Sequence, residues 1–192
     1  YFSLDGSSQL IAKTGYSRIG GFEIYLSRPE LGSSLWETIL EAGRSENIRP
    51  GSPNIIDRVE AGLLSFGNEM TVENTPLECN MDKFLDINKE ADYIGKKVLQ
   101  RQIRYGIKRR IRGVIYNGPK LPTISRPLQV FDIDKRTIVG SLTSGAFSPH
   151  FKRNIGVGMI KYGYWDNNKK ILVNIADQEF REGLIKDLPL IQ

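Results

Sequence analysis

The chain has 192 residues and a mass of 21.7 kDa, which is enough for one large domain or two small ones. Its 40% hydrophobic and 26% charged residues are ordinary for a globular protein and exclude disorder as the dominant state. No apolar run reaches the roughly 18 residues of a transmembrane helix. The net charge of +5 suits an acidic small ligand and is also compatible with weak nucleic-acid affinity.

Cysteine and histidine each occur once, as Cys79 and His150. A single cysteine excludes an internal disulfide and a multi-cysteine zinc site, and we expect no bound metal. The acidic neighbour Glu78 raises rather than lowers a thiol pKa, which predicts a buried, unreactive cysteine. Ser148 precedes His150 closely but has no orienting acid, which argues against a nucleophilic serine. This cysteine usage is typical of a reduced compartment, and we expect a cytoplasmic protein.

The chain begins at Tyr1 rather than at Met, and we expect no signal peptide. We expect a fragment that lacks an N-terminal half. Any function that needs residues upstream of Tyr1 is then invisible in this sequence.

Two strands joined by a glycine-rich turn are predicted near the start of the chain. Residues 9–14 form the first strand, and residues 22–27 form the second with strict alternation of apolar and polar side chains. On the second strand, Glu23 and Tyr25 share one face. Spacing alone leaves two interpretations open. The pair is either a solvated strand face or a hydrogen-bonding edge for a planar heterocycle that carries an amine next to a ring nitrogen.

Three helices are predicted next. Residues 31–42 form an amphipathic helix that stops at Gly43, and residues 54–64 form a shorter one. Asp92 is predicted to cap a helix that runs to about residue 104. Its core side consists of Tyr93, Ile94, Val98 and Leu99.

Charged residues of the second predicted helix have two interpretations. Asp57, Arg58 and Glu60 form surface ion pairs, or Arg58 contacts a ligand. The basic run that follows the third helix either contacts phosphates or is a solvated helix end and barrel edge. It consists of Arg101, Arg104, Lys108, Arg109, Arg110 and Arg112.

Short strands and turns dominate after Gly106, which predicts a small β-barrel or sandwich. The predicted strands are residues 108–116, 128–131, 138–142, 154–160 and 170–175. We therefore divide the chain into domains 1–106 and 107–192. Hydroxyl-bearing residues 141–149 either position a ligand carboxylate or satisfy their own backbone in turns.

Residues 14–25 have the sequence TGYSRIGGFEIY. This segment resembles the folate-binding strand pair of the aminomethyltransferase family, which includes the T-protein of the glycine cleavage system. Further similar blocks follow in the family's order. They are RVEAG at 58–62, FGNE at 66–69, NTPLE at 74–78, DYIGK at 92–96, VGSLTSGAFSP at 139–149 and KRNIGVG at 152–158.

The resemblance implies an α+β fold, with the back half of the T-protein-like folate-binding region followed by a small C-terminal β-barrel. It implies that Glu23 grips the pterin ring of tetrahydrofolate, with Tyr25 in the same site. Tetrahydrofolate is then the methyl acceptor. The family's catalytic aspartate lies upstream of this chain, so no catalytic residue is assigned here. The expected partner for the site is the N-terminal half of the same protein.

Departures from the family pattern favour methyl transfer over aminomethyl transfer. Ile19 and Gly20 stand where the family's turn has two acids, and Asn54 stands where T-proteins have a folate-contacting arginine. The stretch 15–25 resembles most the branch that demethylates dimethylsulfoniopropionate. That branch implies transfer of a methyl group from this sulfonium to tetrahydrofolate, giving methylmercaptopropionate and 5-methyltetrahydrofolate. Tyr16 and Phe22 are candidates to hold the sulfonium by cation–π contacts.

Two alternatives stay open. One is a glycine cleavage T-protein or a demethylase of methylated glycines. The other is a non-catalytic folate-binding protein in RNA modification or metal-cluster maintenance, although such relatives carry a KGCYxGQE-type motif that is absent from this sequence. We expect a small-molecule methyl donor and folate as ligands, with no membrane and no nucleic acid. A homodimer is compatible with the sequence.

Overall fold

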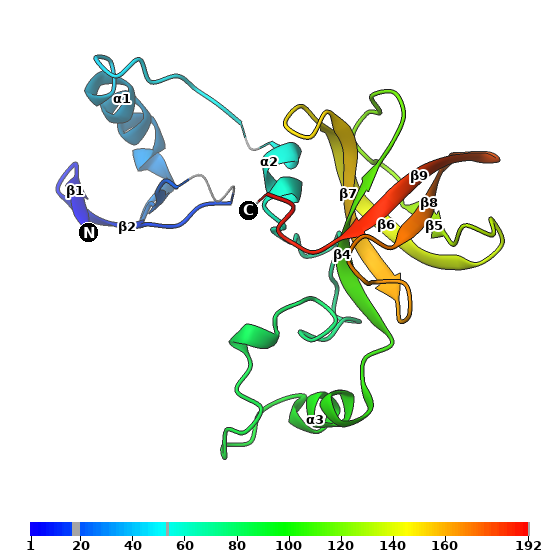
Figure 1. Cartoon of the computed structure of the whole chain (residues 1–192). Helices are drawn as coiled ribbons and strands as arrows, with labels where there is room; N and C mark the ends of the chain where they lie inside the picture. Colours follow the sequence, from blue (N-terminus) through cyan, green and yellow to red (C-terminus); the bar gives the residue numbers. More distant parts are fainter. Residues whose placement is uncertain (17–19, 53, 192) are drawn as a thin grey trace. The chain divides into compact units, whose positions relative to one another are not determined.

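The computed structural model describes residues 1–16, 20–52 and 54–191. The chain forms two compact units, Tyr1–Asn54 and Ile55–Gln192 (Figure 1). The domain boundary predicted between residues 106 and 107 lies inside the second unit, in the link from a helix to the barrel. It stays a prediction.

The first unit begins with a three-stranded antiparallel sheet. In sheet order its strands are β1 (Phe2–Leu4), β2 (Ser7–Ala12) and β3 (Glu23–Tyr25). Both predicted strands are present, but β2 ends before Thr14 and β3 covers only the middle of residues 22–27. Pairing stops at Ala12 opposite Glu23. Beyond that rung, Gly20 and Gly21 have φ values of 73° and 141°, which cannot continue the ladder.

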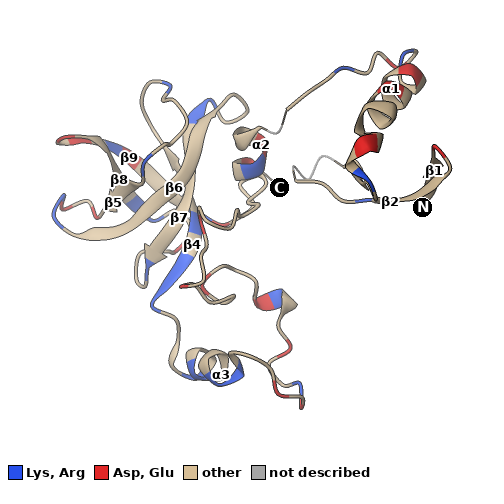
Figure 2. Ribbon diagram, turned by 180° about the vertical axis from the view of Figure 1, so that it is seen from behind, with Lys and Arg blue, Asp and Glu red and all other residues tan. Residues whose placement is uncertain are grey.

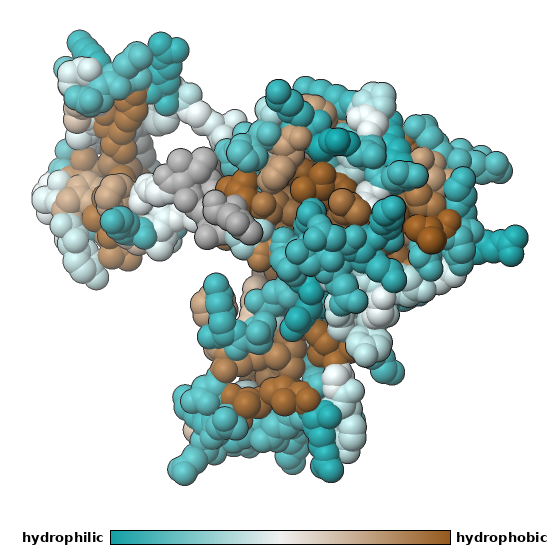
Figure 3. Space-filling view, in the orientation of Figure 1, coloured by the Kyte–Doolittle hydropathy of each residue, from teal (hydrophilic) through white to brown (hydrophobic). Residues whose placement is uncertain are grey.

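The predicted first helix is confirmed. A 3₁₀ turn, η1 (Pro29–Leu31), leads into α1 (Gly32–Ala42). The helix stops at Gly43, whose N–H donates to the Ile39 carbonyl at 2.9 Å. No residue of α1 is buried, and Trp36 is 53% exposed. Figure 3 accordingly shows hydrophobic side chains on the surface of this unit.

The second unit begins with helices that are shorter than predicted. They are α2 (Ile55–Glu60) and α3 (Lys96–Tyr105), and a 3₁₀ turn that was not predicted, η2 (Asp82–Phe84), lies between them in the chain. The helix α2 stops four residues before predicted residue 64, because Gly62 turns the chain with a φ of 67°. The Leu63 N–H then bonds the Arg58 carbonyl at 3.0 Å and closes the helix end.

The predicted cap of the third helix is wrong. The helix α3 begins only at Lys96, after Gly95, which has a φ of 86° and provides no side-chain cap. Asp92 instead accepts a hydrogen bond from the Tyr93 N–H at 3.1 Å, inside the preceding loop. Of the predicted core side, Leu99 is buried but Ile94 is fully exposed. The loop conformation therefore overrides the helical spacing at this end.

The rest of the second unit is a closed antiparallel barrel, which decides between the predicted barrel and sandwich (Figure 1). Around the barrel the strand order is β4-β7-β6-β5-β8-β9. The strands are β4 (Arg109–Tyr116), β5 (Leu128–Phe131), β6 (Ile138–Ser148), β7 (Arg153–Lys161), β8 (Lys170–Ala176) and β9 (Glu179–Lys186). The last strand was not among the predicted ones, and β6 extends through the hydroxyl-rich segment.

Alternating side chains divide the barrel into an inner and an outer apolar cluster. The inner cluster fills the barrel with Val114, Tyr116, Val130, Val139, Leu142, Ile160, Ile171, Val173 and Ile185. The outer cluster joins Ile111, Ile155 and Val157 to Val59 of α2 and to Cys79. Strands β4 and β7 therefore bury both of their faces. Glycine allows the close strand approach: a Cβ at Gly158 would lie 1.9 Å from the Ser141 carbonyl oxygen.

Among the helices that the structure describes, none has the length and apolar character needed to cross a membrane.

Tyr116 is expected to make the stability of the barrel decrease with rising pH in the alkaline range. Burial raises the pKa of this phenol from 10.0 to about 12, against the opposing effect of Arg181. The folded state therefore keeps the proton over a pH range in which the unfolded chain has lost it. We expect the free energy of unfolding to fall as pH rises from about 10 to about 12, and Tyr116→Phe to flatten that fall. Urea unfolding across this range measures it.

The matched control is Tyr162→Phe, because Tyr162 is 72% exposed. An equal alkaline fall in both variants would show that Tyr116 is not the group responsible.

Candidate functional site

Strands β2 and β3 place Glu23 and Tyr25 on one face of the sheet in the first unit. Glu23 lies opposite Ala12, and Tyr25 lies opposite Leu10. Alternation turns Ile24 to the other face. Glu23 and Tyr25 are both exposed, Tyr25 by 53%. The backbone therefore brings together the acid and the phenol that the sequence singled out.

Side-chain hydrogen bonds of Thr14 and Gln9 help to organise this strand pair. Thr14 follows β2 and donates its hydroxyl hydrogen to Oε2 of Glu23. The buried Gln9 accepts the Ser27 N–H through Oε1 at 2.8 Å, just beyond the end of β3. A carboxylate offers about four lone-pair positions, so the bond from Thr14 leaves capacity on both oxygens for a ligand. Thr14 thus orients the carboxylate without saturating it.

Tyr16 and Phe22 flank the turn between the strands, as the sequence predicts. Tyr16 is 50% exposed and Phe22 is 65% exposed. Residues 17–19 of the turn, including part of the family motif, lie outside the described residues. The predicted contact of the two aromatic rings with a sulfonium therefore stays a prediction.

A buried ion pair lies in the second unit, between α2 and the barrel. Arg58 donates from both terminal nitrogens to the two carboxylate oxygens of Glu69, at 2.9 and 3.1 Å. It also donates to Oγ of Ser144 on β6 at 2.8 Å and to the Leu63 carbonyl at 2.9 Å. The side chains of Arg58 and Glu69 are only 9% and 0% exposed. This bidentate geometry satisfies both charges, as burial requires.

The prediction of surface ion pairs on α2 is wrong for Arg58 and Glu60. Both residues are buried, because α2 packs against the outer side of β6 and β7. Glu60 accepts the hydroxyl hydrogen of Ser148 at 2.5 Å, and the Ser148 oxygen accepts the Phe151 N–H at 3.0 Å. Arg58, which was considered for a ligand contact, instead donates its hydrogen bonds to Glu69, Ser144 and Leu63 within the protein.

The hydroxyl-rich segment 141–149 has a role that neither sequence interpretation included. It lies mostly on β6 rather than in a turn. Its buried Ser144 and Ser148 each bind a charged side chain of α2. These hydroxyls join the helix to the barrel, and an apolar side chain in place of either would remove one hydrogen bond from a buried charge.

Cys79 and His150 have structural surroundings. Cys79 is buried, as predicted. Burial is the main cause that raises the pKa of its thiol, and the Glu78 carboxylate raises it further, whereas Arg109 acts in the opposite direction. The His150 ring packs edge-on against Phe151, with 4.8 Å between ring centroids. Within the described part of the chain, no cluster of three or more His, Cys, Asp or Glu side chains could hold a metal ion.

The basic run divides into exposed and engaged residues. Figure 2 shows Lys and Arg along α3 and at the start of β4. On β4, Arg109 donates to Glu78 at 2.9 Å, and Arg112 pairs with Asp187 near the C-terminus. Arg101 and Arg104 on α3 are exposed. Arg109 and Arg112 of the run therefore form ion pairs at the barrel. That the protein binds no nucleic acid stays a prediction.

Two family models match the chain. The GCVT N-terminal domain matches residues 2–89, and the glycine cleavage T-protein C-terminal barrel domain matches residues 109–188. The chain belongs to the aminomethyltransferase family. The predicted resemblance is thereby confirmed.

Individual members of the aminomethyltransferase family are similar over most of the chain. A dimethylsulfoniopropionate demethylase of Ruegeria pomeroyi is 40% identical over 163 residues, which are 85% of this chain and 43% of that protein. An aminomethyltransferase of a Geobacillus species is 33% identical over 185 residues, 95% of this chain and 50% of that protein. The chain spans about half the length of these relatives.

A solved family structure confirms the predicted fold. The glycine cleavage system aminomethyltransferase T from Bartonella henselae superposes with a TM-score of 0.78 at 22% identity. The superposition covers 94% of this chain and 49% of that structure. The α+β fold with a C-terminal β-barrel is therefore the family's fold.

Arg58 and Glu69 are the site residues that sequence reasoning did not connect. Each belongs to a family block, RVEAG or FGNE, which was the available signal. Charged residues in such blocks are exposed far more often than buried. Only the folded chain shows that the two blocks share an ion pair.

Glu69→Gln should destabilise the second unit strongly. The amide keeps the shape of the side chain but leaves the Arg58 charge buried without its partner, which costs about 3–5 kcal/mol. The free energy of unfolding in urea measures the loss, followed by fluorescence of Trp165, which packs against the barrel core.

Glu73→Gln is the matched control, because Glu73 is exposed in the same connecting segment. A loss below about 1 kcal/mol for Glu69→Gln, as for an exposed pair, would contradict the assigned burial of the ion pair.

Proposed function

We propose that the protein transfers a methyl group from dimethylsulfoniopropionate to tetrahydrofolate, producing methylmercaptopropionate and 5-methyltetrahydrofolate. The observation that carries the proposal is the exposed Glu23–Tyr25 face, in a segment that matches the family's N-terminal domain. The choice of donor is supported by the Ruegeria relative, a dimethylsulfoniopropionate demethylase that is 40% identical.

Glu23 suits the recognition of a pterin. A pterin ring carries an amine next to a ring N–H, and an ionised carboxylate accepts two parallel hydrogen bonds from such an edge. The exposed position of Glu23 on β3 leaves its carboxylate accessible, and Thr14 holds its orientation. Tyr25, on the same face, offers a ring to pack beside the pterin and a hydroxyl for hydrogen bonding.

The proposed reaction requires positioning more than proton transfer. The folate supplies a nitrogen nucleophile. The new N–C bond forms as the C–S bond of the sulfonium breaks, the sulfur leaves as a neutral thioether, and the nitrogen releases its proton. Holding the two reactants in line is the main contribution that such a displacement needs. Tyr16 and Phe22 are proposed to hold the sulfonium through their ring faces.

Two donors distinguish the proposal from its alternative. The protein as its gene encodes it is incubated with tetrahydrofolate and either dimethylsulfoniopropionate or dimethylglycine. We expect 5-methyltetrahydrofolate with the sulfonium only. Formation of 5,10-methylenetetrahydrofolate from dimethylglycine would instead favour the amine chemistry suggested by the 33% identical aminomethyltransferase. Folate binding without turnover of either donor would overturn the enzyme proposal.

Thr14→Val should weaken tetrahydrofolate binding by about threefold to tenfold. The substitution keeps the shape of the side chain but removes the hydroxyl that orients Glu23, and one such hydrogen bond contributes about 0.5–1.5 kcal/mol. Titration calorimetry measures the dissociation constant. Thr14→Ser retains the hydroxyl and should restore most of the affinity.

The same titration on Glu23→Gln tests whether Thr14 affects folate binding through the orientation of the Glu23 side chain. If Thr14 acts through Glu23, Thr14→Val should have little further effect in the Glu23→Gln background. Additive losses would contradict that coupling, whereas equal affinity in all variants would contradict the folate site itself.

A further inference from the structure

A hollow on the outer face of the barrel lies across β4, β9 and β8 in the second unit. Its volume is about 530 Å³, which is within the range of small-molecule sites. It is not part of the strand pair in the first unit that carries the proposed folate site. We name it the outer hollow and define it by Ile115, Ile133, Lys135, Arg153, Lys170, Leu172, Glu182 and Leu184.

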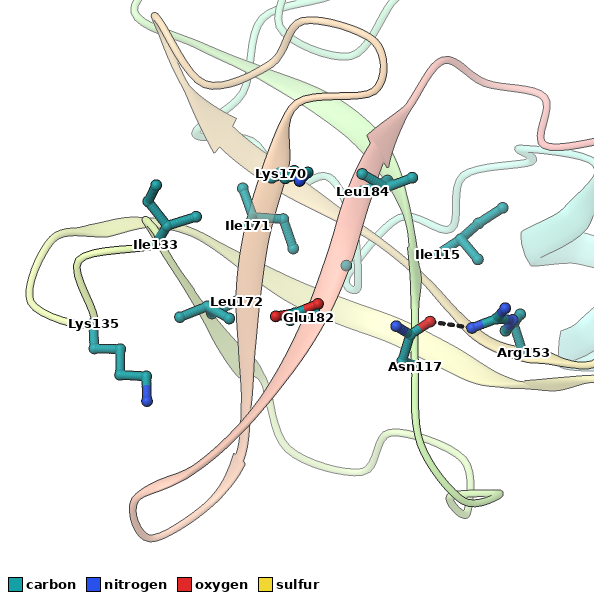
Figure 4. Close-up of a pocket in the computed structure, with 11 residues that line it drawn as sticks. Ile115, Asn117, Ile133, Lys135, Arg153, Lys170, Ile171, Leu172, Glu182 and Leu184 are labelled. Atoms are coloured by element: carbon teal, nitrogen blue, oxygen red, sulfur yellow. Dashed lines mark hydrogen bonds between the residues drawn. The ribbon is translucent and has the colours of Figure 1, made fainter.

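The floor of the outer hollow is built from two rungs of the barrel. In one rung, Leu184 of β9 lies opposite Ile115 of β4 and opposite Lys170 of β8. In the next rung, Glu182 lies opposite Leu172. Directly opposed side chains lie about 5 Å apart, so these residues form one continuous surface. Figure 4 shows them spread over the three strands.

Apolar side chains make most of this floor. Leu172 is 8% exposed although alternation turns it away from the barrel interior. The exposed Ile133, from the hairpin between β5 and β6, adds an apolar wall at one end. Ile115 connects the floor to the outer cluster under α2. Hydrocarbon placed here would be removed from water on several sides.

Positive charges surround the apolar floor. Lys135, Lys170 and Arg153 border the outer hollow, against the single acid Glu182. Arg153 is held in place by a hydrogen bond to Asn117 (Figure 4). Within the described part of the chain, neither Lys170 nor Glu182 forms an ion pair. The excess of positive charge selects an anion.

We propose that the outer hollow binds a small amphipathic carboxylate, with its hydrocarbon part over Leu172 and Leu184 and its carboxylate at the positively charged border formed by Lys135, Lys170 and Arg153. Neither a neutral nor a cationic molecule of the same shape satisfies the charges of this border. Glu182 opposes an anion in the middle of the floor, which keeps the carboxylate at the positively charged border (Figure 4). This site is independent of the proposed methyl transfer.

Three eight-carbon probes test the proposal on the protein as its gene encodes it: octanoate, octanol and octylammonium. Methyl NMR signals of Ile115, Ile133, Leu172 and Leu184 report binding at the outer hollow. We expect these signals to shift in saturable titrations with octanoate, at concentrations about tenfold lower than with octanol or octylammonium. Equal responses to all three probes, or no shift of these methyls, would overturn the proposal.

Charge variants test the role of the charged border. Lys135→Glu with Lys170→Glu should weaken octanoate binding by about tenfold and leave octanol binding unchanged. Glu182→Gln should strengthen octanoate binding by about twofold to threefold. The matched control is Lys83→Glu with Lys97→Glu, which changes the net charge equally at exposed positions outside the hollow. An equal loss in that control would show a general charge effect and overturn the site.

Discussion

The architecture of the second unit depends on the buried ion pair between Arg58 and Glu69. Its charges are almost completely removed from water, so neither can lose the other without a large cost. The pair fixes the loop that carries Glu69 against α2, and Ser144 extends the same network to β6. Glu60 of α2 and Ser148 of β6 add a second hydrogen bond between the helix and the barrel. A helix of only six residues is thereby held in one orientation on the barrel.

The barrel itself is organised by strands that bury two faces. Side chains on alternate positions of β4 and β7 enter either the closed interior or the outer cluster under α2. Glycines let neighbouring strands approach where a side chain would meet backbone, as at Gly158. The outer face is covered only in part. Leu188 and Leu190 pack on the outer cluster, whereas the face across β8 and β9 forms the outer hollow.

The two units serve function in different ways. In the second unit, the buried charges of Arg58 and Glu60 bind partners within the protein. The first unit keeps Glu23 and Tyr25 exposed on a short strand, and the Thr14 hydroxyl restrains the Glu23 carboxylate. A recognition carboxylate needs this combination of access and fixed orientation. The proposed folate chemistry therefore belongs to an exposed strand face with an oriented carboxylate.

The sequence by itself determined the family, the α+β fold and the shared face of Glu23 and Tyr25, because motif order and strand alternation are local properties. It also located most barrel strands. Tertiary structure alone decided the fate of Arg58, Glu60 and the hydroxyls of β6, since the burial of a charge depends on partners far away in the chain. Barrel closure through β9 and the start of α3 after Gly95 were also visible only in the folded structure. Local preferences yield there to long-range pairing and to glycine backbone geometry.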